Sequence, residues 1–181
     1  MATTPAFDAA TWIAQNTYGG TLLTPEATAA VANFTMMWNL FEGIVCGNAA
    51  KVPQFEGLAA RLSEAAVPLD TMNSLDDCLA FWTLRYRTPE GFTDRFLGLY
   101  FRNNDRREIV EEVLLGQRQS LSDKVLTLMI IVYRLRNNLF HGLKTLEMLN
   151  DQVDNLNTAS RCLGVLMTLS RSHLVTHSPR G

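Results

Sequence analysis

The stretch that decides the fold is LSDKVLTLMIIVYRLRNNLFH, residues 121–141. Ser120 stands just before it with Asp123 three residues later, close to the capping box that begins a helix. Residues 125–133 carry little that is polar, so the pattern predicts a long helix that is apolar round most of its circumference and therefore buried. Its end is different in character, because polar side chains crowd into eight residues: Arg134, Arg136, Asn137, Asn138 and His141.

The sequence outside this helix also predicts helices. Alternating strand patterns and hairpin dipeptides are nearly absent, whereas Thr24-Pro25-Glu26 and Thr88-Pro89-Glu90 each place a capping Thr before a Pro. Ser74 with Asp77 resembles a second capping box. We predict helices over 25–46, 55–66, 75–87, 90–101, 105–117, 121–141 and 145–173, preceded by a short helix that ends at Tyr18-Gly19-Gly20. The expected architecture is all-α, a single antiparallel bundle with extra short helices over 21–181 and an N-terminal appendage over 1–20.

Composition narrows the class of protein. The 181 residues, 47% of them apolar and 19% charged, suit one globular domain. Three widely spaced cysteines predict buried, reduced thiols rather than a disulfide framework. With no membrane-spanning run and no signal-peptide pattern, we expect a cytoplasmic protein without membrane contact. The net charge of −2 is uneven, since residues 85–144 hold eleven Lys and Arg against seven Asp and Glu. This basic centre is compatible with a nucleic-acid partner.

A helical wheel separates the polar residues of 121–141 into two groups. One stripe, within roughly 40°, contains Asp123, Thr127, Arg134, Asn138 and His141. Arg136 instead falls among apolar side chains. A charge there must pair, extend to solvent at the helix end, or serve a functional site.

Arg and His together suit phosphodiester chemistry. A histidine with a pKa near ~6.5 can take a proton from a ribose 2′-hydroxyl or give one to the leaving 5′-oxygen. An arginine can neutralise the charge that develops on the phosphate oxygens. The sequence shows no metal-binding motif and no glycine-rich phosphate loop, and we expect neither a metal nor another cofactor.

The segment Arg136-Asn137-Asn138-Leu139-Phe140-His141 resembles the motif of the HEPN superfamily, in which a polar residue follows an Arg and a His stands five positions after that Arg. The resemblance implies a HEPN-like helical domain with Arg136 and His141 catalytic and Asn137 as polar companion. It also implies metal-independent endoribonuclease activity that leaves 2′,3′-cyclic phosphate and 5′-hydroxyl ends, in a toxin, phage-defence or stress-response setting. Arg134 fits the longer spacing that the family allows.

The resemblance further implies RNA as a partner, a homodimer whose two motifs form one composite site, and an antitoxin or sensor as a possible further partner. A dimer would answer a geometric problem, since Arg136 and His141 point about 140° apart on a straight helix. An early helix end at Gly142 is the other solution.

Further residues are candidates for supporting roles. Arg134 and Asn138 would support the chemistry, and Glu42 would contact the residues that carry it out. Four cations would contact RNA: Lys144, Arg102, Arg106 and Arg107. Two alternatives remain open. The polar end of the helix is also what an ordinary C-terminal cap would contain. The chain could equally be a non-catalytic interaction or RNA-binding module, or one subunit of a larger complex.

Overall fold

The computed structural model describes residues 6–64, 66–141 and 145–176, the last five by their backbone alone. Helices dominate these residues, which confirms the all-α class. The elements in chain order are α1 (Ala9–Asn16), η1 (Gly20–Leu22), α2 (Pro25–Ile44), α3 (Val52–Ser63), α4 (Leu69–Tyr86), β1 (Arg87–Thr88), β2 (Gly91–Phe92), α5 (Asp94–Leu97), α6 (Arg107–Leu114), α7 (Leu121–Phe140), η2 (Glu147–Gln152) and α8 (Val153–Thr176).

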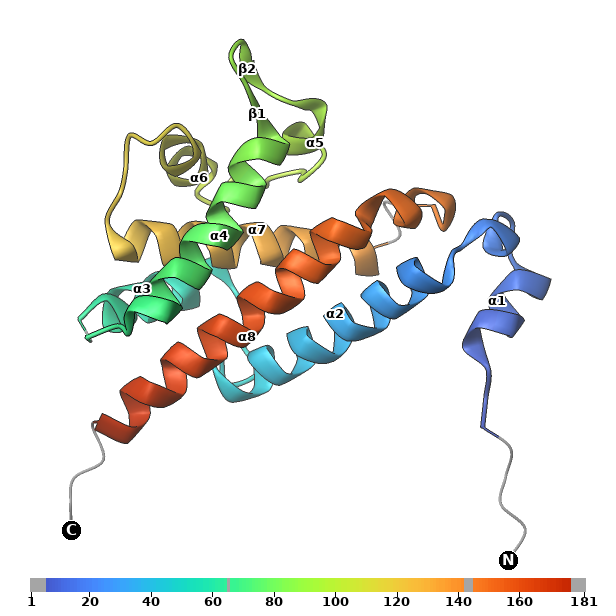
Figure 1. Ribbon diagram of the computed structural model, residues 1–181, viewed down its shortest axis with the longest axis horizontal. Coiled ribbons are helices and arrows are strands. Elements are labelled where there is room, and N and C mark those ends of the chain that lie inside the picture. Colours follow the sequence, from blue (N-terminus) through green and yellow to red (C-terminus); the bar gives the residue numbers. More distant parts are fainter. Residues whose placement is uncertain (1–5, 65, 142–144, 177–181) are drawn as a thin grey trace, which may run out of the picture.

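Helix α7 runs through the centre of the molecule (Figure 1). Ser120 caps it by accepting a hydrogen bond from the backbone N–H of Asp123 at 3.1 Å, and its hydroxyl donates to the Asp123 carboxylate at 2.7 Å. Every residue of α7 from Val125 to Val132 is buried. Helix α3 packs along one side of α7, and α6 and α4 pack on others. The sequence therefore placed this helix correctly, both in extent and in depth.

Helices α2 and α8 form the most extensive helix pair and run in the same direction (Figure 1). Asn150 of η2 joins their starting ends, because its amide donates to the carbonyl of Leu22 at 2.7 Å and accepts from the N–H of Thr24 at 3.0 Å. Helices α4 and α7 run opposite to α8. The bundle is thus all-α but mixed in direction.

The prediction of a helix over 90–101 is wrong. Residues 87–92 form a small antiparallel hairpin in which Arg87 pairs with Phe92 and Thr88 with Gly91. Gly91 has φ of +142°, a conformation that other residues rarely adopt. Thr93, not Thr88, caps the short α5. Ser74 also starts no helix, since it lies inside α4 and its hydroxyl bonds back to the carbonyl of Asp70.

The three cysteines are buried and free, as expected. Burial, aided by the nearby Glu42 carboxylate, raises the pKa of Cys46 to about 12. Across the part of the chain that the structure describes, no helix combines the length and the apolar character needed to cross a bilayer.

Candidate functional site at the end of α7

Two residues of the polar stripe of α7, Arg134 and Asn138, are buried beneath the segment between α5 and α6. Arg134 is 2% exposed and Asn138 is 1% exposed. The Nε of Arg134 donates to the carbonyl of Leu99 at 3.0 Å. The Asn138 amide donates to the carbonyls of Gly98 and Leu99 at 3.0 and 3.2 Å. Two side chains from one helix therefore satisfy the backbone of a loop that has little secondary structure of its own.

A buried carboxylate balances the charge of Arg134. Its Nη1 lies 3.2 Å from Oδ2 of Asp105, which is 5% exposed and also accepts the backbone N–H of Arg102 at 2.6 Å. Burial lowers the pKa of Arg134 and the Asp105 charge opposes that effect. An ion pair this deep is costly to break, because either partner alone would be a buried charge. Arg134 thus acts in holding the fold together.

Arg136 occupies a different environment on the same helix turn. Its guanidinium carbon lies 5.7 Å from the centre of the Trp38 ring and 5.1 Å from that of Phe140. Its Nη1 donates to Asn137 Oδ1 at 3.1 Å. Among the described residues no carboxylate forms an ion pair with Arg136. The expectation of an arginine in apolar surroundings is confirmed, and aromatic rings supply those surroundings.

Glu42 reaches this arginine through Trp38. The indole Nε1 of Trp38 donates to Glu42 Oε2 at 2.8 Å, so the carboxylate fixes the ring on which Arg136 rests. The sequence pattern alone did not identify Trp38 as a neighbour of Arg136. Its spacing of four residues from Glu42 was the available signal, because residues four apart lie on the same helix face.

His141 is the residue at which α7 ends. Its backbone N–H donates to the carbonyl of Asn137 at 3.0 Å, while its side chain is exposed and forms no hydrogen bond or ion pair with a described residue. Gly142 lies outside the described residues, so the expected change of direction there stays a prediction. The imidazole is therefore placed where a ligand can reach it.

Of the cations expected to contact RNA, the structure places two in ion pairs with carboxylates. Arg106 pairs with Glu56 and Arg107 with Glu111, each at 2.7 Å between Nε and a carboxylate oxygen. Arg107 also lies over the Phe96 ring. Arg102 is exposed without an ion pair among the described residues, and Lys144 lies outside them. Their contact with RNA stays a prediction.

No group of three His, Cys, Asp or Glu side chains within 6–64, 66–141 and 145–171 could hold a metal ion. Comparison of the chain with known protein families, with curated proteins and with solved structures found no match. The arrangement at the end of α7 must therefore be judged on its own chemistry. It offers one exposed imidazole just after the last residue of α7, and one guanidinium on the last two turns of that helix without a carboxylate partner among the described residues.

Proposed function

We propose that this chain is a metal-independent endoribonuclease of the HEPN type, with Arg136 and His141 at the chemical step. The observation that carries the proposal is that some polar side chains at the end of α7 are paired within the protein and others are not. Arg134 and Asn138 both donate hydrogen bonds to the Leu99 carbonyl. Arg134 also forms an ion pair with Asp105. The side chains of Arg136 and His141 have neither a carboxylate partner nor a backbone acceptor among the described residues. Asn137 orients Arg136.

The reaction is a transesterification within the RNA strand. The imidazole of His141 takes the proton from a ribose 2′-hydroxyl, whose oxygen attacks the adjacent phosphorus. The bond between phosphorus and the 5′-oxygen breaks, and that oxygen takes a proton from the imidazolium or from water and leaves as a hydroxyl. The products are a 2′,3′-cyclic phosphate and a 5′-hydroxyl. Arg136 neutralises charge on the phosphate oxygens in the transition state.

A second copy of the chain would complete the site. The two side chains leave α7 about 140° apart, so Arg136 of one copy and His141 of another can meet at one phosphate in a symmetric dimer. Such an enzyme in a toxin, defence or stress-response setting would need control, which an antitoxin or a sensor would provide.

The test is RNA cleavage in excess EDTA by the wild type and His141→Ala, with analysis of the product ends. We expect the wild type to leave cyclic phosphate ends and His141→Ala to lose activity at least a hundredfold while unfolding at the same urea concentration. Arg136→Lys keeps the charge but loses the planar fork, so activity should fall there too. Arg61→Ala, an exposed arginine on α3, is the control. Equal cleavage by the wild type and His141→Ala would refute the proposal.

A second candidate function is that of an interaction module. The observation that favours it is a row of exposed apolar side chains, Met36, Leu40 and Ile44, spaced four residues apart on α2 and 60, 50 and 47% exposed. Such a row is typical of a surface that another protein covers. Leu40→Lys tests whether this surface mediates self-association, and RNA cleavage by the wild type separates the two functions. Loss of self-association without any RNA cleavage by the wild type would favour the module.

A further inference from the structure

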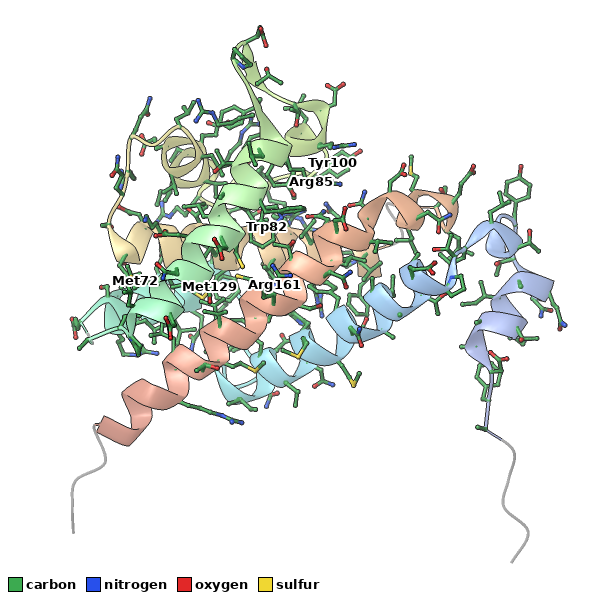
Figure 2. All side chains as sticks on the ribbon, viewed as in Figure 1. Met72, Trp82, Arg85, Tyr100, Met129 and Arg161 are labelled. Carbon is green, nitrogen blue, oxygen red and sulfur yellow. The ribbon has the colours of Figure 1, made fainter. Side chains whose placement is uncertain are left out.

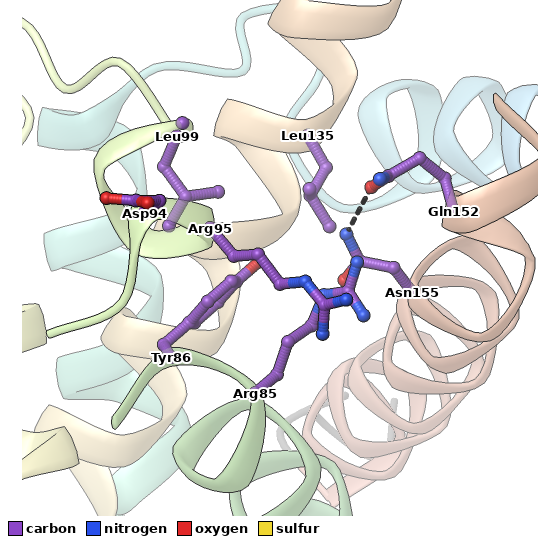
Figure 3. A pocket seen from close by; sticks show the side chains of 9 residues that line it. Arg85, Tyr86, Asp94, Arg95, Leu99, Leu135, Gln152 and Asn155 are labelled. Atoms are coloured by element: carbon purple, nitrogen blue, oxygen red, sulfur yellow. Dashed lines mark hydrogen bonds between the residues drawn. The ribbon is translucent and has the colours of Figure 1, made fainter. Parts of the chain in front are cut away.

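A second polar site lies where α4 ends. A cavity of about 230 Å³ opens between α4, α5, α7 and the start of α8. Figure 3 shows its interior, and Figure 2 places Arg85 at the upper end of α4. The residues that define its chemistry are Arg85, Tyr86, Arg95 and Asn155, and Leu99 and Leu135 supply apolar wall.

Two arginines line this cavity, and neither is in an ion pair with a carboxylate of the described residues. The guanidinium groups of Arg85 and Arg95 lie side by side in Figure 3, and neither forms an ion pair with any described residue. Asp94 also lines the cavity but points away from them in the figure. Burial lowers the pKa of Arg85; the charge of Arg95 adds to this, and Asp154 and Tyr86 oppose it. Two cations held together in this way favour binding of an anion.

The cavity floor contains hydrogen-bond donors without acceptors. Arg85 makes one long hydrogen bond, from Nη2 to the carbonyl of Asp151 at 3.4 Å, and its buried Nε has no partner. Tyr86 is 1% exposed, and its hydroxyl lies close to Arg85 and Asn155 but forms no hydrogen bond of regular geometry with either. Figure 3 shows this hydroxyl directed toward the arginines. A buried donor left unpaired costs free energy, which a bound acceptor would recover.

We propose that this cavity binds the terminal phosphate group of a small molecule or of an RNA end. A phosphate monoester offers three free oxygens and nearly two negative charges, which match two guanidinium groups and a hydroxyl donor. Its single covalent attachment lets the group enter a cavity whose floor is closed by Tyr86 and Asn155. A phosphodiester within a strand carries one charge, and the strand continues from it on both sides, so the cavity would need two exits. Because none of these residues belongs to the α7 motif, the site stands or falls independently of the nuclease.

Calorimetric titration with inorganic phosphate tests the site, with dimethyl phosphate as the diester control at equal ionic strength. We expect saturable binding of phosphate only. Arg85→Gln should weaken it at least tenfold, as loss of a charge-assisted hydrogen bond does. Arg95→Gln, which alters an exposed side chain, should also weaken it and is not expected to disturb folding. Arg61→Gln removes the same charge elsewhere and should bind like the wild type.

Tyr86→Phe gives the sharpest readout. It should weaken phosphate binding about fivefold, yet change the stability of the phosphate-free protein little, because the buried hydroxyl that it removes forms no hydrogen bond of regular geometry. A trinucleotide with a 5′-phosphate that displaces inorganic phosphate, when its 5′-hydroxyl counterpart does not, would identify an RNA end as the source. Displacement by neither would assign the site to small phosphates. Equal displacement by both, absence of saturable binding, or unchanged binding in Arg85→Gln and Arg95→Gln would overturn the proposal.

Discussion

Two arginines that stand two positions apart on α7 lie in different surroundings. Arg134 is 2% exposed and held by Asp105 and the Leu99 carbonyl, whereas Arg136 rests between Trp38 and Phe140. Helix geometry places their side chains about 200° apart. One face meets a loop rich in backbone acceptors and the other meets aromatic rings. The same residue type is therefore held in a buried ion pair at one position and lies against aromatic rings at the other.

Replacing Arg134 should be far more damaging than replacing Arg136. Arg134→Met leaves the Asp105 carboxylate buried without its cation, so we expect a loss of about 3–5 kcal/mol in the free energy of unfolding, measured in urea. Arg136→Met should lose about 1 kcal/mol, mainly its interaction with the rings.

The double variant Arg134→Met with Asp105→Asn should recover part of the loss, because it removes both charges. A loss below about 1 kcal/mol in the single Arg134 variant would contradict the view that this pair stabilises the fold.

At the scale of elements, two serines with similar sequence contexts behave differently. Ser120 caps α7, while Ser74 lies inside α4. Ser120→Ala should therefore reduce the free energy of unfolding by about 1 kcal/mol, the usual value of an N-cap. Ser74→Ala should change it by less than about 0.5 kcal/mol. Urea unfolding of both variants measures the difference, and equal effects would argue against the cap at Ser120.

The sequence correctly predicted those helices whose start or apolar face is determined by residues close together in the chain. The cap at Ser120 and the long apolar run of 121–141 are of this kind, as are Thr24 and the start of α2. Thr88-Pro89-Glu90 carries an equally good local signal, yet Gly91 turns the chain into a hairpin. The helix wheel separated Arg134 from Arg136 correctly. It could not show that Arg134 is buried, because Leu99 and Asp105 reach it only through the tertiary fold.

At the scale of the whole molecule, one side chain ties together segments far apart in sequence. Asn150 bonds to both Leu22 and Thr24 and so fixes the start of α2 against η2. Asn150→Ala should lower the free energy of unfolding by about 1–2 kcal/mol, the value of two hydrogen bonds. Amide exchange at Thr24 should accelerate. Asn157→Ala, exposed on α8, is the matched control and should leave both quantities unchanged.

The parallel pairing of α2 and α8 has a consequence for the time course of synthesis. Phe34, Trp38 and Phe41 of α2 are buried in the finished protein, but α8 follows α2 by more than a hundred residues of chain. At ribosomal speeds that interval lasts on the order of ten seconds. During that interval the aromatic face of α2 on the nascent chain lacks its contacts with α8. We therefore expect the protein to be most prone to aggregation during its synthesis.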